Sequence, residues 1–341
     1  MLGVGGWTLF GSARANTYYQ GPISDHFDGV RFFNPGQPGP RGRLDFFRWQ
    51  LGDRGASWPT EFASPFPADR PPARVDGDTV RIVYVGHASF LIQTRGRNIL
   101  LDPVWADRAS PFTFVGPKRV NPPGIAFAHL PKIDAVLVTH NHYDHMNTPT
   151  IGQLWRRDRP RVVTPLGNDT ILKADVPGLT ADAVDWDATV DLGDGIRIYA
   201  EPTMHWSARG TSDRSHALWA SFVIETGSRK IYCVGDSGFG DGRTFRRVKE
   251  RHPRLDAALL PIGAYEPRWF MINAHMNPDD AVQALLLCGA AVAFGHHWGT
   301  FRLTNEPVEQ PQTDLQTALS KHGVAAEQFS ALRPGEVRQL G

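Results

Sequence analysis

Three histidines and one aspartate stand within six consecutive residues near the middle of the chain. They are His140, His142, Asp144 and His145, and the apolar run at residues 135–138 before them predicts a buried strand. Imidazole nitrogens and carboxylate oxygens are preferred ligands of Zn²⁺. In a tight loop after a strand, His140 and His142 can point towards one ion, while Asp144 and His145 face a second. The alternative is a solvated loop that is merely rich in histidine.

Three more residues of ligand type appear later in the chain. His205, Asp236 and His297 each follow an apolar run that predicts a strand. Each of them alone would more often be structural. The ends of strands gather along one edge of a layered α/β fold, however, and binding sites form there. The joint arrangement therefore predicts a metal centre made of these three residues and the four in the histidine-rich loop.

Strands and helices alternate along most of the chain, as the positioning of such a centre requires. Helices are expected at 148–157, with Thr148 as N-cap, at 168–173, and between Asn277 and Gly289. Strands are expected at residues 80–85, 89–93, 98–101, 135–138, 161–163, 196–200, 221–225, 230–234 and 290–294. This order predicts an α/β fold with hairpins at its beginning.

Residues 1–75 differ in composition from residues 76–341. Thirteen of the first 66 residues are Phe, Tyr or Trp, against 23 of the remaining 275, and no regular periodicity is visible. Such a segment cannot form a core of its own. We therefore expect residues 1–75 to wrap onto a single core domain formed by residues 76–341.

Charge and hydropathy exclude several classes of partner. Lys and Arg (36) almost balance Asp and Glu (35), so no overall field favours nucleic acid, and no nucleic-acid partner is expected. No run approaches the roughly 20 apolar residues of a membrane-spanning helix. The apolar opening at residues 2–10 is short and lacks a basic region before it, and whether it is the remnant of an anchor or signal stays open. Cys233 and Cys288 both lie in apolar runs, which indicates buried free thiols.

The metal-ligand pattern resembles that of the metallo-β-lactamase superfamily, His-x-His-x-Asp-His followed by His, Asp and His. Within the superfamily, the sequence resembles the N-acylphosphatidylethanolamine-hydrolysing phospholipase D family. The segments that carry this resemblance are His26-Phe27-Asp28-Gly29, Gly86-His87-Ala88-Ser89-Phe90, Leu101-Asp102-Pro103, His205-Trp206, Gly263-Ala264-Tyr265-Glu266-Pro267-Arg268-Trp269-Phe270-Met271 and His297-Trp298-Gly299-Thr300-Phe301.

This resemblance implies an αββα sandwich that holds two Zn²⁺ ions per chain. It implies that His140, His142 and His205 bind one zinc, that Asp144, His145 and His297 bind the other, and that Asp236 bridges them. His275 matches a family histidine beside the site. The Trp-Gly-Thr-Phe run favours His297 over its neighbour His296 as the ligand, and His296 should then point away from the metal.

The activity implied is hydrolysis of a phosphodiester in N-acylphosphatidylethanolamine-like phospholipids, of the phospholipase D type. Asp144 or Asp236 would orient the attacking water and accept its proton. Tyr265, Arg268 and Trp269 are candidate substrate contacts, although Arg268 is equally well suited to an internal salt bridge.

Two other functions fit the same residues. One is a soluble lactonase or small-molecule phosphoesterase of this fold, and the other is a non-catalytic metal-binding scaffold. The substrate is accordingly a lipid or a small-molecule phosphodiester. The aromatic N-terminal segment suits either peripheral membrane contact or ordinary packing. A location in the cytoplasm or at the membrane periphery and a homodimeric state are both open expectations.

Overall fold

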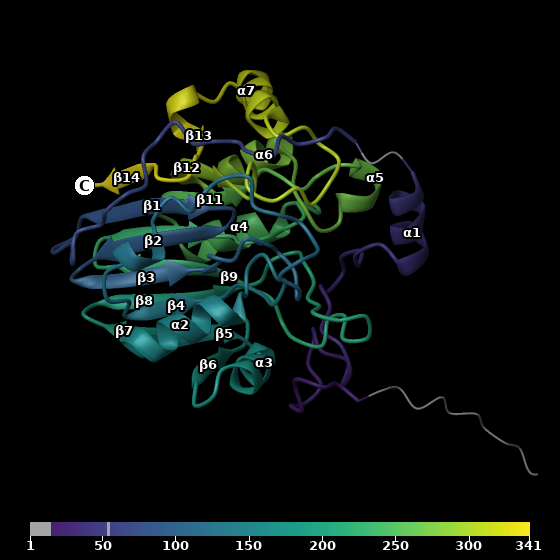
Figure 1. Cartoon of the computed structure of the whole chain (residues 1–341), viewed down its shortest axis with the longest axis horizontal. Helices are drawn as coiled ribbons and strands as arrows, with labels where there is room; N and C mark the ends of the chain where they lie inside the picture. The colour runs from purple at the N-terminus through teal and green to yellow at the C-terminus, as the bar shows by residue number, and fades with distance from the viewer. Residues whose placement is uncertain (1–14, 53–54) are drawn as a thin grey trace, which may run out of the picture.

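Two seven-stranded sheets face each other in the computed structural model of the chain, which describes residues 15–52 and 55–341 (Figure 1). Each sheet is antiparallel in one half and parallel in the other. In spatial order, the first sheet comprises β14 (Val337–Leu340), β1 (Val80–Gly86), β2 (Ser89–Thr94), β3 (Arg97–Leu101), β4 (Ala135–Leu137), β5 (Arg161–Pro165) and β6 (Ala181–Val184). The second comprises β13 (Phe329–Ala331), β12 (Ala290–His296), β11 (Leu255–Pro261), β10 (Arg229–Cys233), β9 (Ser221–Thr226), β8 (Ile196–Glu201) and β7 (Thr189–Gly193).

Helices cover the outer face of each sheet. On the first sheet, α2 (Thr148–Asp158) and α3 (Asn168–Asp175) bury apolar side chains against the strands. On the second, α4 (Arg243–Arg251), α6 (Pro278–Cys288) and α7 (Gln310–His322) do the same. A third apolar core fills the space between the two sheets. These layers confirm the αββα sandwich, in a single domain.

Capping signals explain where two of the predicted helices begin and end. Helix α6 starts after Asn277, whose side chain accepts a hydrogen bond from the Asp280 amide, and it ends at Gly289 with a φ of 69°. Helix α2 differs in detail from the prediction, because Asn147 and not Thr148 is its N-cap. The Thr148 hydroxyl instead donates to Asp175 across to α3.

Several elements were not predicted from the sequence. Strand β11 lies between β10 and β12 with both faces covered, so it lacks the alternation that marks a half-exposed strand. Helices α4 and α7 and the short strands β6, β7, β13 and β14 were missed as well. Two short 3₁₀ turns, Phe127–His129 and Ala326–Gln328, complete the pattern together with α1 (Arg43–Leu51) and α5 (Arg268–Met271).

The described part of the N-terminal segment lies along the outside of the sandwich. Phe27 and Phe32 are buried against Leu218 and Trp219, whereas α1 buries none of its residues and lies beside α5 at the edge of the molecule (Figure 1). Within residues 15–52 and 55–341, none of the helices has the length and apolar composition that a membrane span requires. The apolar run at residues 2–10 lies outside the described residues, and both cysteines are buried and free.

Candidate metal centre

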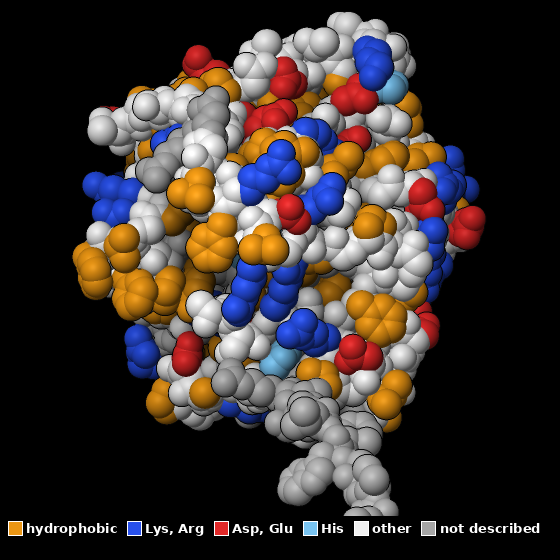
Figure 2. Space-filling view, turned by 90° about the vertical axis from the view of Figure 1, so that its right-hand side faces the viewer, with side chains coloured by type: hydrophobic (Ala, Val, Ile, Leu, Met, Phe, Trp, Pro, Cys, Tyr) orange, Lys and Arg blue, Asp and Glu red, His pale blue; other side chains and the backbone are white. Residues whose placement is uncertain are grey.

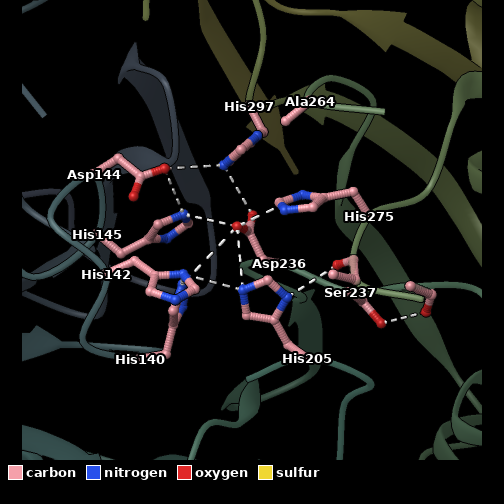
Figure 3. A network of polar contacts seen from close by, with 12 residues as sticks. His140, His142, Asp144, His145, His205, Asp236, Ser237, Ala264, His275 and His297 are labelled. Carbon is pink, nitrogen blue, oxygen red and sulfur yellow. Dashed lines mark hydrogen bonds and ion pairs between the residues drawn. The ribbon is translucent and has the colours of Figure 1, made fainter. Parts of the chain in front are cut away.

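Four strand ends from the two sheets meet at one edge of the sandwich. The histidine-rich loop follows β4 of the first sheet, and His205, Asp236 and His297 follow β8, β10 and β12 of the second. Figure 3 shows the imidazole rings of these segments arranged around the Asp236 carboxylate. All seven predicted ligands are thereby brought together, and all but His142 are buried.

Hydrogen bonds behind the rings fix which nitrogen faces the centre. The Nδ1 atom of His145 lies 2.8 Å from Asp102 Oδ2, and the Nδ1 atom of His205 lies 2.9 Å from the Ala274 carbonyl oxygen. His140 Nδ1 lies 3.0 Å from the Thr139 hydroxyl. Because these outer contacts occupy Nδ1, the Nε2 atom of each ring is directed inwards.

The first group of ligand atoms has the spacing of a small coordination sphere. His142 presents Nδ1, which lies 2.9 Å from His140 Nε2 and 3.3 Å from His205 Nε2. Nitrogen ligands on one tetrahedral zinc, at bond lengths of about 2.0–2.1 Å, lie roughly 3.3 Å apart. These three nitrogens and Asp236 together form a group whose atoms all lie within 4.8 Å of one another.

The second group lies on the other side of Asp236. Asp144 Oδ2 is 3.6 Å from His145 Nε2 and 3.3 Å from His297 Nε2. Asp236 contacts both groups: its Oδ2 atom lies 3.3 Å from His145 Nε2 and 3.7 Å from His205 Nε2, and its Oδ1 atom lies 3.1 Å from His297 Nε2. The carboxylate of Asp236 is thus positioned between the two sets of ligands.

The electrostatics of these residues fit a bound cation. His145 Nε2, His297 Nε2 and Asp236 Oδ1 are buried and have no hydrogen-bond partner. Burial holds the pKa of His140 and of His205 well below the usual range, which leaves neutral imidazoles able to bind metal. Such a donor set, with imidazole nitrogens and carboxylate oxygens converging in a buried site, fits a divalent metal ion.

The pKa shifts of Asp236 and His145 also fit a bound cation. Burial alone would raise the pKa of Asp236, but His297 and His145 outweigh it and hold this pKa well below its usual range. Conversely, Asp236 and Asp144 overcome the effect of burial on His145 and raise its pKa well above the usual value. Protons on the histidines supply the positive charge that a metal ion would otherwise provide beside these carboxylates.

Two residues of the predicted motifs, Asp102 and His87, support the ligands from behind. Asp102 accepts hydrogen bonds from the backbone and hydroxyl of Thr139, both at 2.7 Å, besides its contact with His145. His87 Nε2 lies 2.8 Å from Asp144 Oδ2, and its ring lies 4.1 Å from that of His297. Both supporting residues have positive φ, which brings their side chains back towards the centre.

The adjacent histidines His296 and His297 point in different directions. His297 joins the second ligand group, whereas His296 ends β12 in the core and packs edge-on against Phe90 at 5.5 Å. His275 lies beside the centre, with its Nδ1 atom 3.9 Å from Asp236 Oδ2. Burial lowers the pKa of His275 to about 4, so its imidazole is neutral near pH 7.

A cavity of about 1330 Å³ opens above the metal centre. Its wall includes residues of three separate regions: the N-terminal segment and α1, the loop after His205, and α5 with the residues that follow it. Representative lining residues are Arg31, Phe46, Trp206, Arg214, Phe270 and His275. Trp206 and Asp28 belong to segments that carry the family resemblance, but no sequence pattern marked Arg31 or the residues of α1 as part of the site.

The three predicted substrate contacts make other contacts in this structure. None of Tyr265, Arg268 and Trp269 lines this cavity. The Tyr265 hydroxyl donates to Asp314 at 2.6 Å, and the Arg268 guanidinium pairs with Asp280 and donates to the His275 carbonyl at 2.7 Å. The Arg48 guanidinium lies over the Trp269 ring at 5.2 Å, and both residues line a separate cavity of about 670 Å³ together with Tyr265. The internal salt bridge is therefore what the structure shows for Arg268.

A family model and several known proteins are similar to this chain, and they agree on its family. The model of the beta-lactamase superfamily domain matches residues 97–298. The chain is 35% identical over 265 residues to N-acyl-phosphatidylethanolamine-hydrolyzing phospholipase D 1 of Caenorhabditis elegans. This match covers 74% of the chain and 74% of the C. elegans protein. It is 32% identical over 226 residues to the mitochondrial N-acyl-phosphatidylethanolamine-hydrolyzing phospholipase D of Saccharomyces cerevisiae, covering 65% of this chain and 48% of that one.

A solved structure shares the fold. A metallo hydrolase of Ignicoccus hospitalis superimposes with a TM-score of 0.56 at 20% identity, over 77% of this chain and 99% of that one. The matched domain model and the similar proteins agree with the buried cluster of histidines and aspartates. The chain is therefore a metal-dependent hydrolase that belongs to the metallo-β-lactamase superfamily and, within it, to the family of N-acyl-phosphatidylethanolamine-hydrolyzing phospholipases D.

Proposed function

We propose that the chain holds two zinc ions and hydrolyses the phosphodiester of N-acylphosphatidylethanolamine-like phospholipids in the manner of a phospholipase D, so that phosphatidic acid and the N-acylethanolamine are released. The observation that carries this proposal is the position of Asp236. Its carboxylate lies between two groups of ligand atoms at the floor of a cavity large enough for part of a lipid. Paired metal sites of this kind are typical of enzymes that cleave phosphate esters.

The residues divide into two ligand sets. His140, His142 and His205 would hold one ion, and Asp144, His145 and His297 the other, with Asp236 shared between them. When bound, two zinc ions would supply a lowered pKa for water and positive charge beside the phosphoryl oxygens.

Three side chains would carry the proton chemistry. Asp144 and Asp236 keep carboxylate oxygens at the floor of the cavity, where they can orient a water molecule and accept its proton. His275 faces the same cavity with an unpartnered Nδ1 atom. As a neutral imidazole it can hydrogen-bond to the oxygen that leaves phosphorus, and that oxygen would take up the proton that the carboxylates accept from water.

The cavity wall suits an acyl chain. Phe46, Phe47, Phe270 and Met271 line it on the side of α1 and α5. Figure 2 shows hydrophobic side chains gathered on the face of the molecule that it displays. Leu44 and Leu51 on α1 and Ile272 after α5 are exposed apolar residues. Burying such surface contributes about 0.8 kcal/mol per CH₂ group.

This face also suits a position at the membrane periphery. Apolar side chains flanked by arginines are typical of proteins that lie at a lipid interface without crossing it. The similar proteins of C. elegans and S. cerevisiae are named for hydrolysis of an N-acylated phospholipid. In this proposal the segment up to residue 75 serves the core domain by building one wall of its substrate cavity.

A chain-length series tests the proposal. We would load the protein with zinc, present N-acylphosphatidylethanolamines of increasing acyl length in mixed micelles, and measure release of phosphatidic acid. We expect kcat/KM to rise steeply with length and then level off.

Two outcomes would assign a different function. A flat series together with faster cleavage of a short water-soluble ester or lactone would contradict the lipid substrate and leave the metal-dependent hydrolase. Zinc-loaded protein that cleaves none of these substrates would favour the non-catalytic scaffold.

A further inference from the structure

Four arginines of the cavity wall are not neutralised by carboxylates. Arg31, Arg41, Arg43 and Arg214, the arginine cluster, all line the cavity above the metal centre. Among the described residues, none of the four has a carboxylate oxygen within 4.0 Å. Figure 2 shows Lys and Arg side chains grouped near the middle of this face, between hydrophobic ones.

Three of the four arginines donate to backbone carbonyl groups. Arg41 Nε donates to the Trp269 carbonyl at 3.1 Å, and Arg214 donates to the Arg41 carbonyl at 2.8 Å. Arg43 donates to the carbonyl of Thr211. Each of these contacts satisfies part of a guanidinium group, which carries five N–H donors, and none of them compensates its charge.

The positive charge of the cluster contributes to the lowered pKa values of two groups in the cavity wall. Burial, and then the charges of Arg31 and Arg43, lower the pKa of the Arg214 guanidinium below its usual value. Burial and Arg31 likewise lower the pKa of His216, which lines the same cavity. Three carboxylates also line it: Asp144 and Asp236 belong to the metal centre, and Asp28 accepts from the backbone amides of residues 30 and 31.

Arg214 lies one aromatic ring away from a metal ligand. Its Cζ atom is 4.9 Å from the centroid of Trp206, and the Trp206 ring centroid is 4.5 Å from that of His142. An anion held by Arg214 would therefore lie beside the reacting phosphodiester and within reach of the same lipid. Planar guanidinium groups bind carboxylate and phosphate oxygens through paired hydrogen bonds.

We infer that Arg31, Arg43 and Arg214 form an anion subsite that binds a second oxyanion group, phosphate or carboxylate, next to the scissile phosphodiester. This inference rests on the proposed function and names the substrate class more narrowly: lipid phosphodiesters that carry, or lie next to, another negative group. The second oxyanion has two sources, the substrate itself or the headgroup of a neighbouring anionic lipid.

Matched substrates test the first source. N-glutaryl-phosphatidylethanolamine ends in a free carboxylate, and its methyl ester is the same molecule without that charge. In micelles of a neutral detergent, we expect the zinc-loaded wild type to favour the carboxylate by about tenfold in kcat/KM, mainly through KM. Arg214→Gln should abolish the preference, and Arg214→Lys should keep part of it.

A second arm tests the neighbouring lipid. The methyl ester alone is presented in neutral micelles with and without phosphatidylglycerol. A rate increase of similar size on adding phosphatidylglycerol, again lost in Arg214→Gln, would assign the second oxyanion to a separate lipid.

The controls separate the subsite from bulk charge and from misfolding. Arg254→Gln removes the same charge from an exposed position outside the cavity and should behave as wild type. Melting temperature and zinc content of each variant report on folding. The subsite is contradicted if neither arm shows a gain in the wild type, or if Arg214→Gln retains a gain as large as that of Arg254→Gln. Cleavage of neither lipid by the wild type would contradict the proposed function, and the inference would fall with it.

Discussion

The floor of the cavity is made by side chains at the ends of sheet strands, whereas its rim is made by α1, the loop after His205 and α5. The floor is buried and its polar atoms lie within hydrogen-bonding or metal-binding distance of one another. The rim carries exposed apolar side chains, such as Phe47 at 59% exposure, and arginines that form no ion pair with another described residue. The strand ends of the sandwich thus determine the shape and charge of the cavity floor. The segments that pack around the sandwich determine those of the rim.

This difference leads us to expect separate roles for the floor and the rim in catalysis and in substrate selection. The floor holds what every substrate of the reaction needs, because the scissile phosphodiester is common to all of them. The rim contacts whatever else the substrate carries, so it determines which molecule is cut. Changes to the floor should therefore abolish turnover, whereas changes to the rim should shift selectivity.

The largest effect is expected from the shared carboxylate of the floor. Asp236→Asn removes a charge that both ligand groups contact, and it should lower kcat by about 10³-fold, since metal-ion catalysis contributes several kcal/mol. Elemental analysis of protein prepared without chelators should give close to two ions per chain for the wild type and fewer for this variant.

A milder change to the same floor provides a comparison. Asp102→Asn removes a carboxylate that accepts from Thr139 and lies behind His145, without changing a residue of either ligand group, and it should weaken metal binding by roughly 10- to 100-fold. A fully loaded Asp236→Asn protein with wild-type turnover would show that the floor works without a shared carboxylate.

The second prediction compares two neighbouring histidines. His297→Ala should lose one ion and nearly all turnover, because His297 Nε2 lies within 3.3 Å of both Asp144 and Asp236. His296 has both ring nitrogens buried without a hydrogen-bond partner, so His296→Leu should retain both ions and change the stability by less than about 1.5 kcal/mol. Metal content decides between them, and a metal-depleted His296→Leu variant would mean that this residue supports the centre.

Much of the floor could be predicted from sequence because its signals are local. The histidine-rich loop follows a short apolar strand directly, and a carboxylate or imidazole after each later strand needs only the rule that strand ends meet at one edge. The alternation of elements predicted an α/β fold, and the resemblance implied the αββα layers that the structure shows. Strand β11 was missed because a strand covered on both faces has no alternation to read.

The rim could not be predicted in the same way. Arg31 and Arg214 are separated by more than half of the chain and share one cavity wall only after the N-terminal segment has packed onto Leu218 and Trp219. The position of Arg268 likewise depends on a contact that is distant in the sequence. A motif places this residue near the site, but its partner Asp280, at the start of α6, turns the guanidinium away from the cavity.

The third prediction concerns selectivity at the rim. Phe46→Ser with Phe47→Ser removes two aromatic side chains from the cavity wall of α1. We expect kcat/KM for long-chain N-acylphosphatidylethanolamine to fall by about tenfold, while that for a short-chain analogue changes little. Leu286→Ser, an exposed apolar residue on α6 outside the cavity, is the matched control. Equal losses on both substrates would place the effect in folding or catalysis, not in recognition of the chain.

The smallest expected effect tests how the segment that carries the rim is fastened to the sandwich. His26 Nε2 lies 2.8 Å from Asp185, its Nδ1 atom lies 2.6 Å from Asp25, and its ring stacks on Trp186. Burial alone would lower the pKa of His26, but the hydrogen bonds to Asp185 and Asp25 outweigh it and raise the pKa above the usual value. A group whose pKa is raised by folding contributes stability that is fully present below its unfolded value, near 6.5, and is lost as the pH rises through the folded value.

His26→Gln should therefore destabilise the protein more at pH 6 than at pH 9. Because Asp25 is exposed and Asp185 is half-exposed, solvent screens both pairs, and the difference between the two pH values should be modest, about 0.5–1 kcal/mol in the free energy of unfolding. Chemical denaturation at both pH values measures it, with His129→Gln, at an exposed position, as the control for removing a histidine. A destabilisation that is equal at the two pH values would mean that His26 holds the segment by packing on Trp186 alone. The attachment of the rim would then be insensitive to pH, and any pH dependence of activity would have to arise at the floor.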